Sequence, residues 1–208
     1  LLLVEFLQAR SATSPQLELG RILDLGIWSG EAVGVANAVL VLGLVPEGLR
    51  AVPFKGLAIL KAGFDFDMSI NRRDLSNLAM LEVVFRQLDV SGCWAEGMRW
   101  VNVSIEKLVA ASLRVKTSAL SNVQLREADL SSSQFEDVTV DRANLSGATL
   151  ENAKWIRCKF TRCVFVGARV DRAAFVDCEF TECDFRRVAL ASSHAGTSRF
   201  VDCLPDQQ

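Results

Sequence analysis

The chain has 208 residues, of which 50% are hydrophobic and 23% are charged, so it can build one medium-sized domain with a sizeable core. Its 23 Lys and Arg residues nearly balance its 25 Asp and Glu residues, and the formal net charge is −2. Because the chain has no polybasic run, we expect no direct binding of nucleic acid, and no acidic tail indicates a charge mimic.

The beginning of the chain, LLLVEFLQAR, has no Met, no basic region and no small-residue cleavage site. This start indicates a position inside a longer protein rather than a signal peptide. The longest uncharged apolar stretch runs from Ala32 to Val45 and includes Asn37. It is shorter than the ~20 residues that span a bilayer, so we expect a buried helix and no membrane association.

Residues 1–63 contain several helix signals. A Ser-Pro pair at 14–15 begins one candidate helix, a second begins near Ser29 and stops at Pro46, and GLAILKAG at 56–63 predicts a short helix that ends at Gly63. We therefore expect three or four short helices in 1–63, either as a cap or as the tail of a preceding domain. The composition and the residue pattern change near 63–73, where we expect the boundary of this segment.

From Leu75 onward the chain has a period of five. All 26 positions at multiples of five up to Phe200 are apolar, and a second set with the same period, from Leu78 to Cys203, is apolar or serine. This period matches neither an α-helix at about 3.6 residues nor a flat strand at about 2. It indicates a corner every five residues, with four sides to a coil and coils stacked at the ~4.8 Å strand spacing.

The first part of this region, about 73–117, is ambiguous. Leu88, Leu108 and Leu113 occupy positions where a small residue is expected, and the segments LSNLAMLEVVFRQL and SIEKLVAASL also fit a helical stripe. Periodicity alone does not decide between the two structures. We favour continuous coils because the five-residue register does not slip across this part.

The segment EADLSSSQFEDVTVDRANLSGATLENAKW resembles the pentapeptide-repeat family, whose motif is A(D/N)LXX. Ala128-Asp129-Leu130 and Ala143-Asn144-Leu145 match the motif, and the resemblance is strongest over 118–203. It implies a mainly β fold, a right-handed quadrilateral β-helix of about six coils over 73–205, preceded by the helical segment at 1–63.

The cysteines all occupy one position of the five-residue register. They are Cys93, Cys158, Cys163, Cys178, Cys183 and Cys203. Pairs with four intervening residues do not follow a standard zinc pattern, so we interpret them as small buried hydrophobes. Free thiols suit a reducing compartment, which predicts a cytoplasmic protein.

Other chemistry is poorly supported by the sequence. His194 is the single histidine and occupies an outward position, and the chain has no GxSxG elbow and no phosphate-binding glycine loop. We therefore predict that this protein is not an enzyme and has no metal or other cofactor.

The outer surface is the remaining place for function. The candidate partner surface combines outward apolar residues near the middle of the solenoid with nearby cations: Ile156, Val164, Val166, Val176, Arg114, Lys154 and Arg157. The preference of β-branched residues for strands explains the valines equally well.

Two hypotheses of function follow. The first is a non-catalytic module for protein–protein interaction or sensing, in the C-terminal part of a longer bacterial multidomain protein; its architecture resembles that of NACHT-type NTPases with repeat sensors. The second is a DNA-mimic member of the family that binds DNA gyrase or topoisomerase IV and protects it from quinolones or gyrase toxins. The interspersed charges argue against the second, and the sequence leaves the partner and the oligomeric state open.

Overall fold

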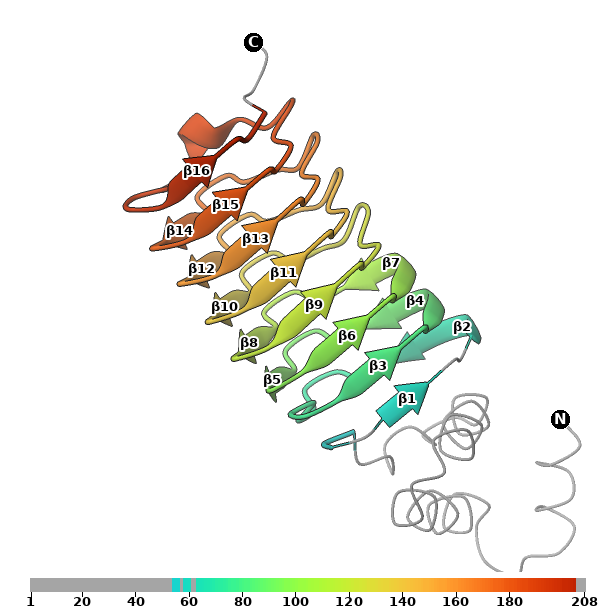
Figure 1. The fold of residues 1–208 in the computed structure, drawn as a ribbon. Helices are drawn as coiled ribbons and strands as arrows, with labels where there is room; N and C mark the ends of the chain where they lie inside the picture. Colours follow the sequence, from blue (N-terminus) through green and yellow to red (C-terminus); the bar gives the residue numbers. More distant parts are fainter. Residues whose placement is uncertain (1–53, 57, 61–62, 205–208) are drawn as a thin grey trace, which may run out of the picture.

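The computed structural model describes residues 54–56, 58–60 and 63–204, which form a mainly β solenoid of about seven turns (Figure 1). Three parallel sheets run along it. The eight-stranded sheet contains β1 (Ala58–Leu60), β3 (Ala79–Leu81), β6 (Arg99–Val101), β9 (Ala119–Ser121), β11 (Thr139–Asp141), β13 (Lys159–Thr161), β15 (Glu179–Thr181) and β16 (Arg199–Val201). The five-stranded sheet contains β5 (Trp94–Glu96), β8 (Arg114–Lys116), β10 (Gln134–Glu136), β12 (Lys154–Ile156) and β14 (Ala174–Val176). The three-stranded sheet contains β2 (Gly63–Ser69), β4 (Val84–Asp89) and β7 (Ser104–Val109).

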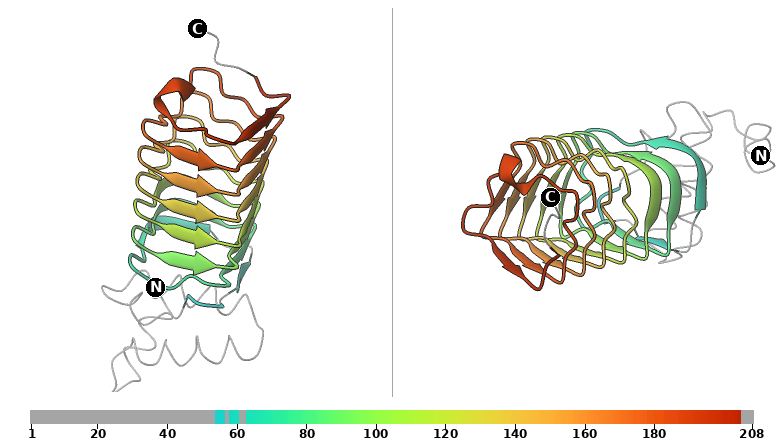
Figure 2. Two further views of the ribbon diagram at one scale, coloured as in Figure 1. Left: turned by 90° about the vertical axis from the view of Figure 1, so that its left-hand side faces the viewer. Right: turned by 90° about the horizontal axis from the view of Figure 1, so that it is seen from above.

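The strand register confirms the coil of 20 residues. Phe135 lies beside Trp155, and Trp155 lies beside Phe175, in neighbouring parallel strands. Each coil has four sides in chain order: the five-stranded side, the eight-stranded side, a third side and a fourth side. Beyond β7, successive coils are connected by single bridges on the third side, such as Gln124 to Asn144, and on the fourth side, such as Asp129 to Thr149. Two further views show the coils stacked one on the next along the solenoid (Figure 2).

A left-handed residue turns the chain at most corners. On one edge these residues are Thr117, Asp137 and Arg157, with φ of 45°, 54° and 51°. Such a backbone costs an L-residue about 1–2 kcal/mol. The backbone amides at these corners are hydrogen-bonded to the next coil, as where Thr117 N–H donates to the Glu136 carbonyl at 2.9 Å.

The positions at multiples of five form the core. From Leu75 to Phe185 every one of them is buried. Where aromatic residues follow one another at this position their rings stack, as for Phe160 on Phe180, with centroids 4.7 Å apart, and Phe165 on Phe185, at 4.8 Å. The interior is therefore a set of parallel side-chain ladders, as the period predicts.

The inward positions two residues before each multiple of five hold the cysteines and other small residues. All six cysteines are free, and each is buried except Cys203, which is partly exposed. The Cys158 thiol donates to the Ile156 carbonyl at 3.4 Å, and the Ser133 hydroxyl donates to the Leu130 carbonyl at 2.5 Å. These side chains fill space and satisfy nearby carbonyls, which confirms their interpretation as structural residues.

The region 73–117 is built of coils and not of helices. Here β4 and β7 each run straight for six residues, and no left-handed residue occurs at positions 87 and 107. Next to this missing corner Leu88 and Leu108 are buried, with 0% and 2% exposure. Leu113 is buried as well, although Ser112 before it has a left-handed φ of 58°, so the coils accept leucine in the small position with or without the corner.

The N-terminal end differs from the expectation. The predicted helix at 56–63 is wrong over Ala58–Leu60, which forms strand β1, and β2 begins at Gly63. The solenoid therefore includes about one more coil than the six predicted from residue 73. The register shifts between Phe64, which pairs with Phe85, and Asp67, which pairs with Gln87, so one residue is inserted there. The helices expected over 1–53 lie outside the described residues.

The regular coils end near η2, a 3₁₀ turn at Leu190–Ser192. Beyond it the apolar ladder residues are no longer fully covered, and Phe200 is 38% exposed. Within the part of the chain that the structure describes, no helix is both long and apolar enough to span a membrane.

Candidate functional site

The five-stranded side presents two outward columns of side chains. In each strand the central residue points inward, and the residues before and after it point outward. The first column contains Trp94, Arg114, Gln134, Lys154 and Ala174, and a bridge from Ala174 adds His194. The second column contains Glu96, Lys116, Glu136, Ile156 and Val176.

The structure divides the candidate partner surface between two sides. Arg114, Lys154, Ile156 and Val176 lie in the two columns, and Arg157 occupies the adjoining corner. Val164 and Val166 lie on the third side, where Val164 bridges Asn144 and Asp184. Because the third side follows two corners after the five-stranded side, these valines face away from the other five residues.

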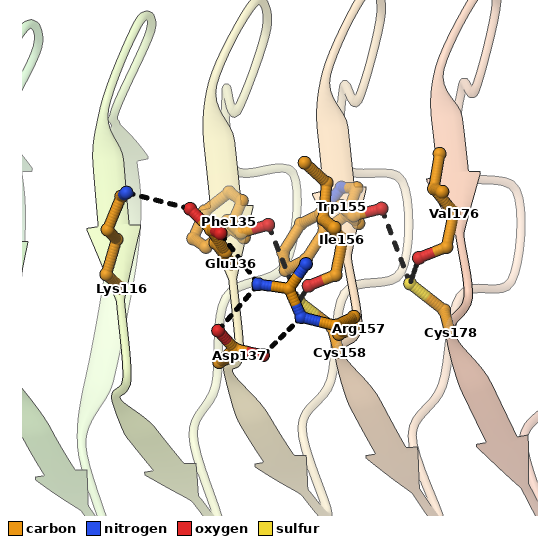
Figure 3. A network of polar contacts seen from close by, with 10 residues as sticks. All are labelled: Lys116, Phe135, Glu136, Asp137, Trp155, Ile156, Arg157, Cys158, Val176 and Cys178. Carbon is orange, nitrogen blue, oxygen red and sulfur yellow. Dashed lines mark hydrogen bonds and ion pairs between the residues drawn. The ribbon is translucent and has the colours of Figure 1, made fainter.

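Arg157 joins two coils through a polar network (Figure 3). Its guanidinium donates from Nε and Nη2 to the two carboxylate oxygens of Asp137, at 2.8 Å each, and from Nη2 to Glu136 at 2.7 Å. Lys116 Nζ lies 2.8 Å from the other oxygen of Glu136. The network therefore spans three successive coils, and two cations balance two carboxylates within it.

These ion pairs change the acidity of the groups. The hydrogen bond from Lys116 lowers the pKa of Glu136, with a further contribution from Arg157, and the hydrogen bond from Arg157 lowers the pKa of Asp137. Both carboxylates stay ionised at neutral pH. The positive charge of Arg157 is compensated within the solenoid, so this residue contributes less to an outside partner than its exposure indicates.

Arg114 and Lys154 are different because no ion pair among the described residues includes them. Both side chains are exposed, and Gln134 lies between them in the first column. The five-stranded side therefore carries two uncompensated cations two coils apart.

Sequence reasoning missed Trp94, the first residue of β5, which is 48% exposed. The five-residue register places Trp94 at an outward position, so a large aromatic side chain at that position is the signal in the sequence that could have identified it. At the other end of the side, Ile156 and Val176 are neighbours in the second column, and Val176 is 36% exposed. Apolar surface thus flanks the two free cations at both ends.

The remaining groups that could carry chemistry are the carboxylates, the thiols and His194. Among the described residues no cluster of three His, Cys, Asp or Glu side chains is arranged to hold a metal ion. Burial raises the pKa of the Cys93 thiol, which keeps it protonated and unreactive at neutral pH. His194 is exposed at the end of the first column, as predicted from its register.

Comparison with known proteins supports the fold. The family model for pentapeptide repeats matches residues 118–147 and 143–181 in eight copies. A trypsin-treated variant of QnrB1, a plasmid-mediated fluoroquinolone resistance protein, is 15% identical with a TM-score of 0.54, covering 74% of this chain and 78% of that chain. No curated protein sequence matches the chain.

Another solved structure has the same kind of repeat but superimposes less well. HetL, a pentapeptide repeat protein involved in heterocyst differentiation regulation from the cyanobacterium Nostoc, is 13% identical with a TM-score of 0.31, covering 73% of this chain and 84% of that chain. At these identities the similarity concerns the fold alone. Residues 118–181 match the pentapeptide-repeat family model, and the same five-residue register continues on both sides of them.

Proposed function

We propose that this solenoid is a rigid, non-catalytic module that binds another protein through its five-stranded side. The observation that carries the proposal is the composition of that side: unpaired Arg114 and Lys154 lie between exposed Trp94 and the apolar pair Ile156 and Val176. Aromatic, apolar and cationic groups on one surface are typical of protein interfaces.

The side is also suited to binding by its rigidity. Each strand is hydrogen-bonded to the coils before and after it, as where Lys154 N–H donates to the Ser133 carbonyl at 2.8 Å. The network of Lys116, Glu136, Asp137 and Arg157 adds side-chain links across three coils. A surface that is already ordered loses little conformational entropy on association.

Site-specific photo-cross-linking tests this proposal with two matched positions. Gln134 lies at the centre of the first column, and Gln124 is an exposed glutamine in the same type of position on the third side. A photo-reactive residue at 134 should trap a defined protein from the source cells, and one at 124 should not. Purified partner should then bind wild-type solenoid and lose affinity for Arg114→Gln/Lys154→Gln.

The alternative function, protection of a type II topoisomerase, makes a separate prediction. A DNA mimic needs aligned carboxylates, whereas the first column holds no carboxylate between Trp94 and His194. We therefore expect no effect in a gyrase supercoiling assay with or without a fluoroquinolone. Inhibition or protection at micromolar protein would support the topoisomerase hypothesis instead.

A further inference from the structure

The first column itself carries positive charge and no carboxylate. Trp94, Arg114, Gln134 and Lys154 follow one another in register through four coils, and all four side chains are exposed. At the adjoining corner between the fourth and five-stranded sides the left-handed residues are Gly92, Ser112, Ser132, Asn152 and Arg172, none of them acidic. The residues before them in the turns include two carboxylates, Glu151, which pairs with Arg169 at 3.4 Å, and Asp171.

The nearest carboxylates of the same strands are in the second column. Glu136 is already held by Lys116 at 2.8 Å and Arg157 at 2.7 Å, and it is not free to neutralise Arg114 or Lys154. Glu96 lies at the end of the sheet, across β5 from Trp94. The column therefore favours an anionic ligand, and its exposure along a flat strand surface leaves room for an extended one.

The spacing of the two cations selects a peptide conformation. Arg114 and Lys154 are two coils apart, which at ~4.8 Å a coil is about 9.6 Å. A polyproline II helix has three residues per turn and rises ~3.1 Å per residue, so equivalent side chains recur every ~9.3 Å. An ordinary β-strand repeats a face every ~6.7 Å, which does not match.

The neighbouring groups suit the same ligand. The exposed ring of Trp94 lies one coil beyond Arg114 and offers a flat surface for a proline ring. The amide of Gln134, between the two cations, can donate to a main-chain carbonyl. These carbonyls have no internal partner in a polyproline II helix.

We propose that the first column binds an acidic segment of a partner protein in the polyproline II conformation. The segment runs along the solenoid axis and places acidic side chains three residues apart on Arg114 and Lys154, with a proline packed on Trp94. This inference rests on the proposed function, and it specifies the chemistry of the partner.

Fluorescence anisotropy with two synthetic peptides tests the inference. One is a labelled (Glu-Pro-Pro)₄ peptide, and the other has the same composition with its glutamates grouped in adjacent pairs. Two exposed ion pairs at about 0.2–1 kcal/mol each correspond to a roughly 2- to 30-fold change in affinity. We expect the regular peptide to bind more tightly than the grouped one, and Arg114→Gln/Lys154→Gln to weaken its binding by this factor.

The matched control is Arg99→Gln/Arg126→Gln, which removes two exposed cations from the eight-stranded and third sides. It should leave the affinity unchanged, and Trp94→Ala should reduce it. Equal affinity for the two peptides would overturn the spacing argument. Tighter binding of an oligothymidylate of equal charge would overturn the choice of a protein segment.

Comparison with the cross-linking result separates the two proposals. If Gln134 traps a partner but neither peptide binds, the acidic-segment inference fails while the proposed function stands. If Gln134 traps no partner and the peptides do not bind, both fail. Far-UV circular dichroism of each variant establishes that the outward substitutions leave the solenoid folded.

Discussion

Replacing a phenylalanine in the middle of a side-chain ladder by alanine should lower the free energy of unfolding much more than replacing a phenylalanine at the end of the same ladder. Phe160 is 1% exposed, stacks on Phe180 at 4.7 Å, and contacts Trp155 and Phe165 edge to face at 5.1 and 5.5 Å. Because packed coils lie on both sides of it, Phe160→Ala leaves a cavity that cannot collapse. We expect a loss of about 3–5 kcal/mol in the free energy of unfolding.

Phe200 provides the matched comparison. It belongs to the same ladder and stacks on Phe180 at 4.8 Å, but it is 38% exposed at the last described coil. Phe200→Ala removes less buried surface, and the site is open on one side, so we expect a loss of about 1–2 kcal/mol.

The assay is guanidinium chloride unfolding followed by far-UV circular dichroism. Repeat proteins can unfold in segments, so the midpoint and the slope of each transition should both be compared. Equal losses for the two variants, or a larger loss for Phe200→Ala, would refute the argument that burial between coils stabilises the ladder.

Three further predictions concern the interior, a corner and the polar network. Val140 borders an apolar cavity of about 20 Å³ between the coils, and Val140→Leu should add about 0.5–1 kcal/mol to the free energy of unfolding, measured by denaturation. Ser132 has a φ of 56°, and a β-branched residue tolerates this region poorly, so Ser132→Val should lower thermal stability by about 1–2 kcal/mol. Arg157→Gln should reduce the dependence of stability on pH, because the pKa values of Glu136 and Asp137 are lowered in the folded state. Such carboxylates contribute stability above their unfolded pKa values, and this is lost as the pH falls through their folded values.

Each of these has a contradicting result. A lower midpoint for Val140→Leu would show that the cavity cannot accept a methylene group. An unchanged midpoint for Ser132→Val would mean that the corner does not constrain its residue. An unchanged pH profile for Arg157→Gln between pH 7 and pH 3 would remove the ion pairs from the account of stability.

The sequence predicts the interior well because burial there follows a strict rule. Positions at multiples of five are buried from Leu75 to Phe185, and the rule weakens in the last coil, where Leu190 and Ala195 are partly buried and Phe200 is exposed. The first coil escapes the rule because one residue is inserted between Phe64 and Asp67. Phe54, Ile59 and Phe64 are buried and keep the spacing of five, one residue out of phase, so a search that allowed one insertion would have found this coil.

The surface is less predictable because neighbouring residues in space come from different coils. Val164 and Val176 are close in sequence, but two corners separate their sides. The pairing of Arg157 with Glu136 and Asp137 depends on side-chain reach across a coil, which periodicity does not determine. The isolation of Arg114 and Lys154 likewise appears only when the register places Gln134 between them.

Lysine footprinting with the purified partner tests the central claim most directly. Lys154 lies in the first column, whereas Lys159, five residues later, is exposed on the eight-stranded side. If the five-stranded side binds the partner, acetylation of Lys154 should slow in the complex and that of Lys159 should not. Protection of Lys159 with Lys154 still reactive would place the interface on another side and contradict the account.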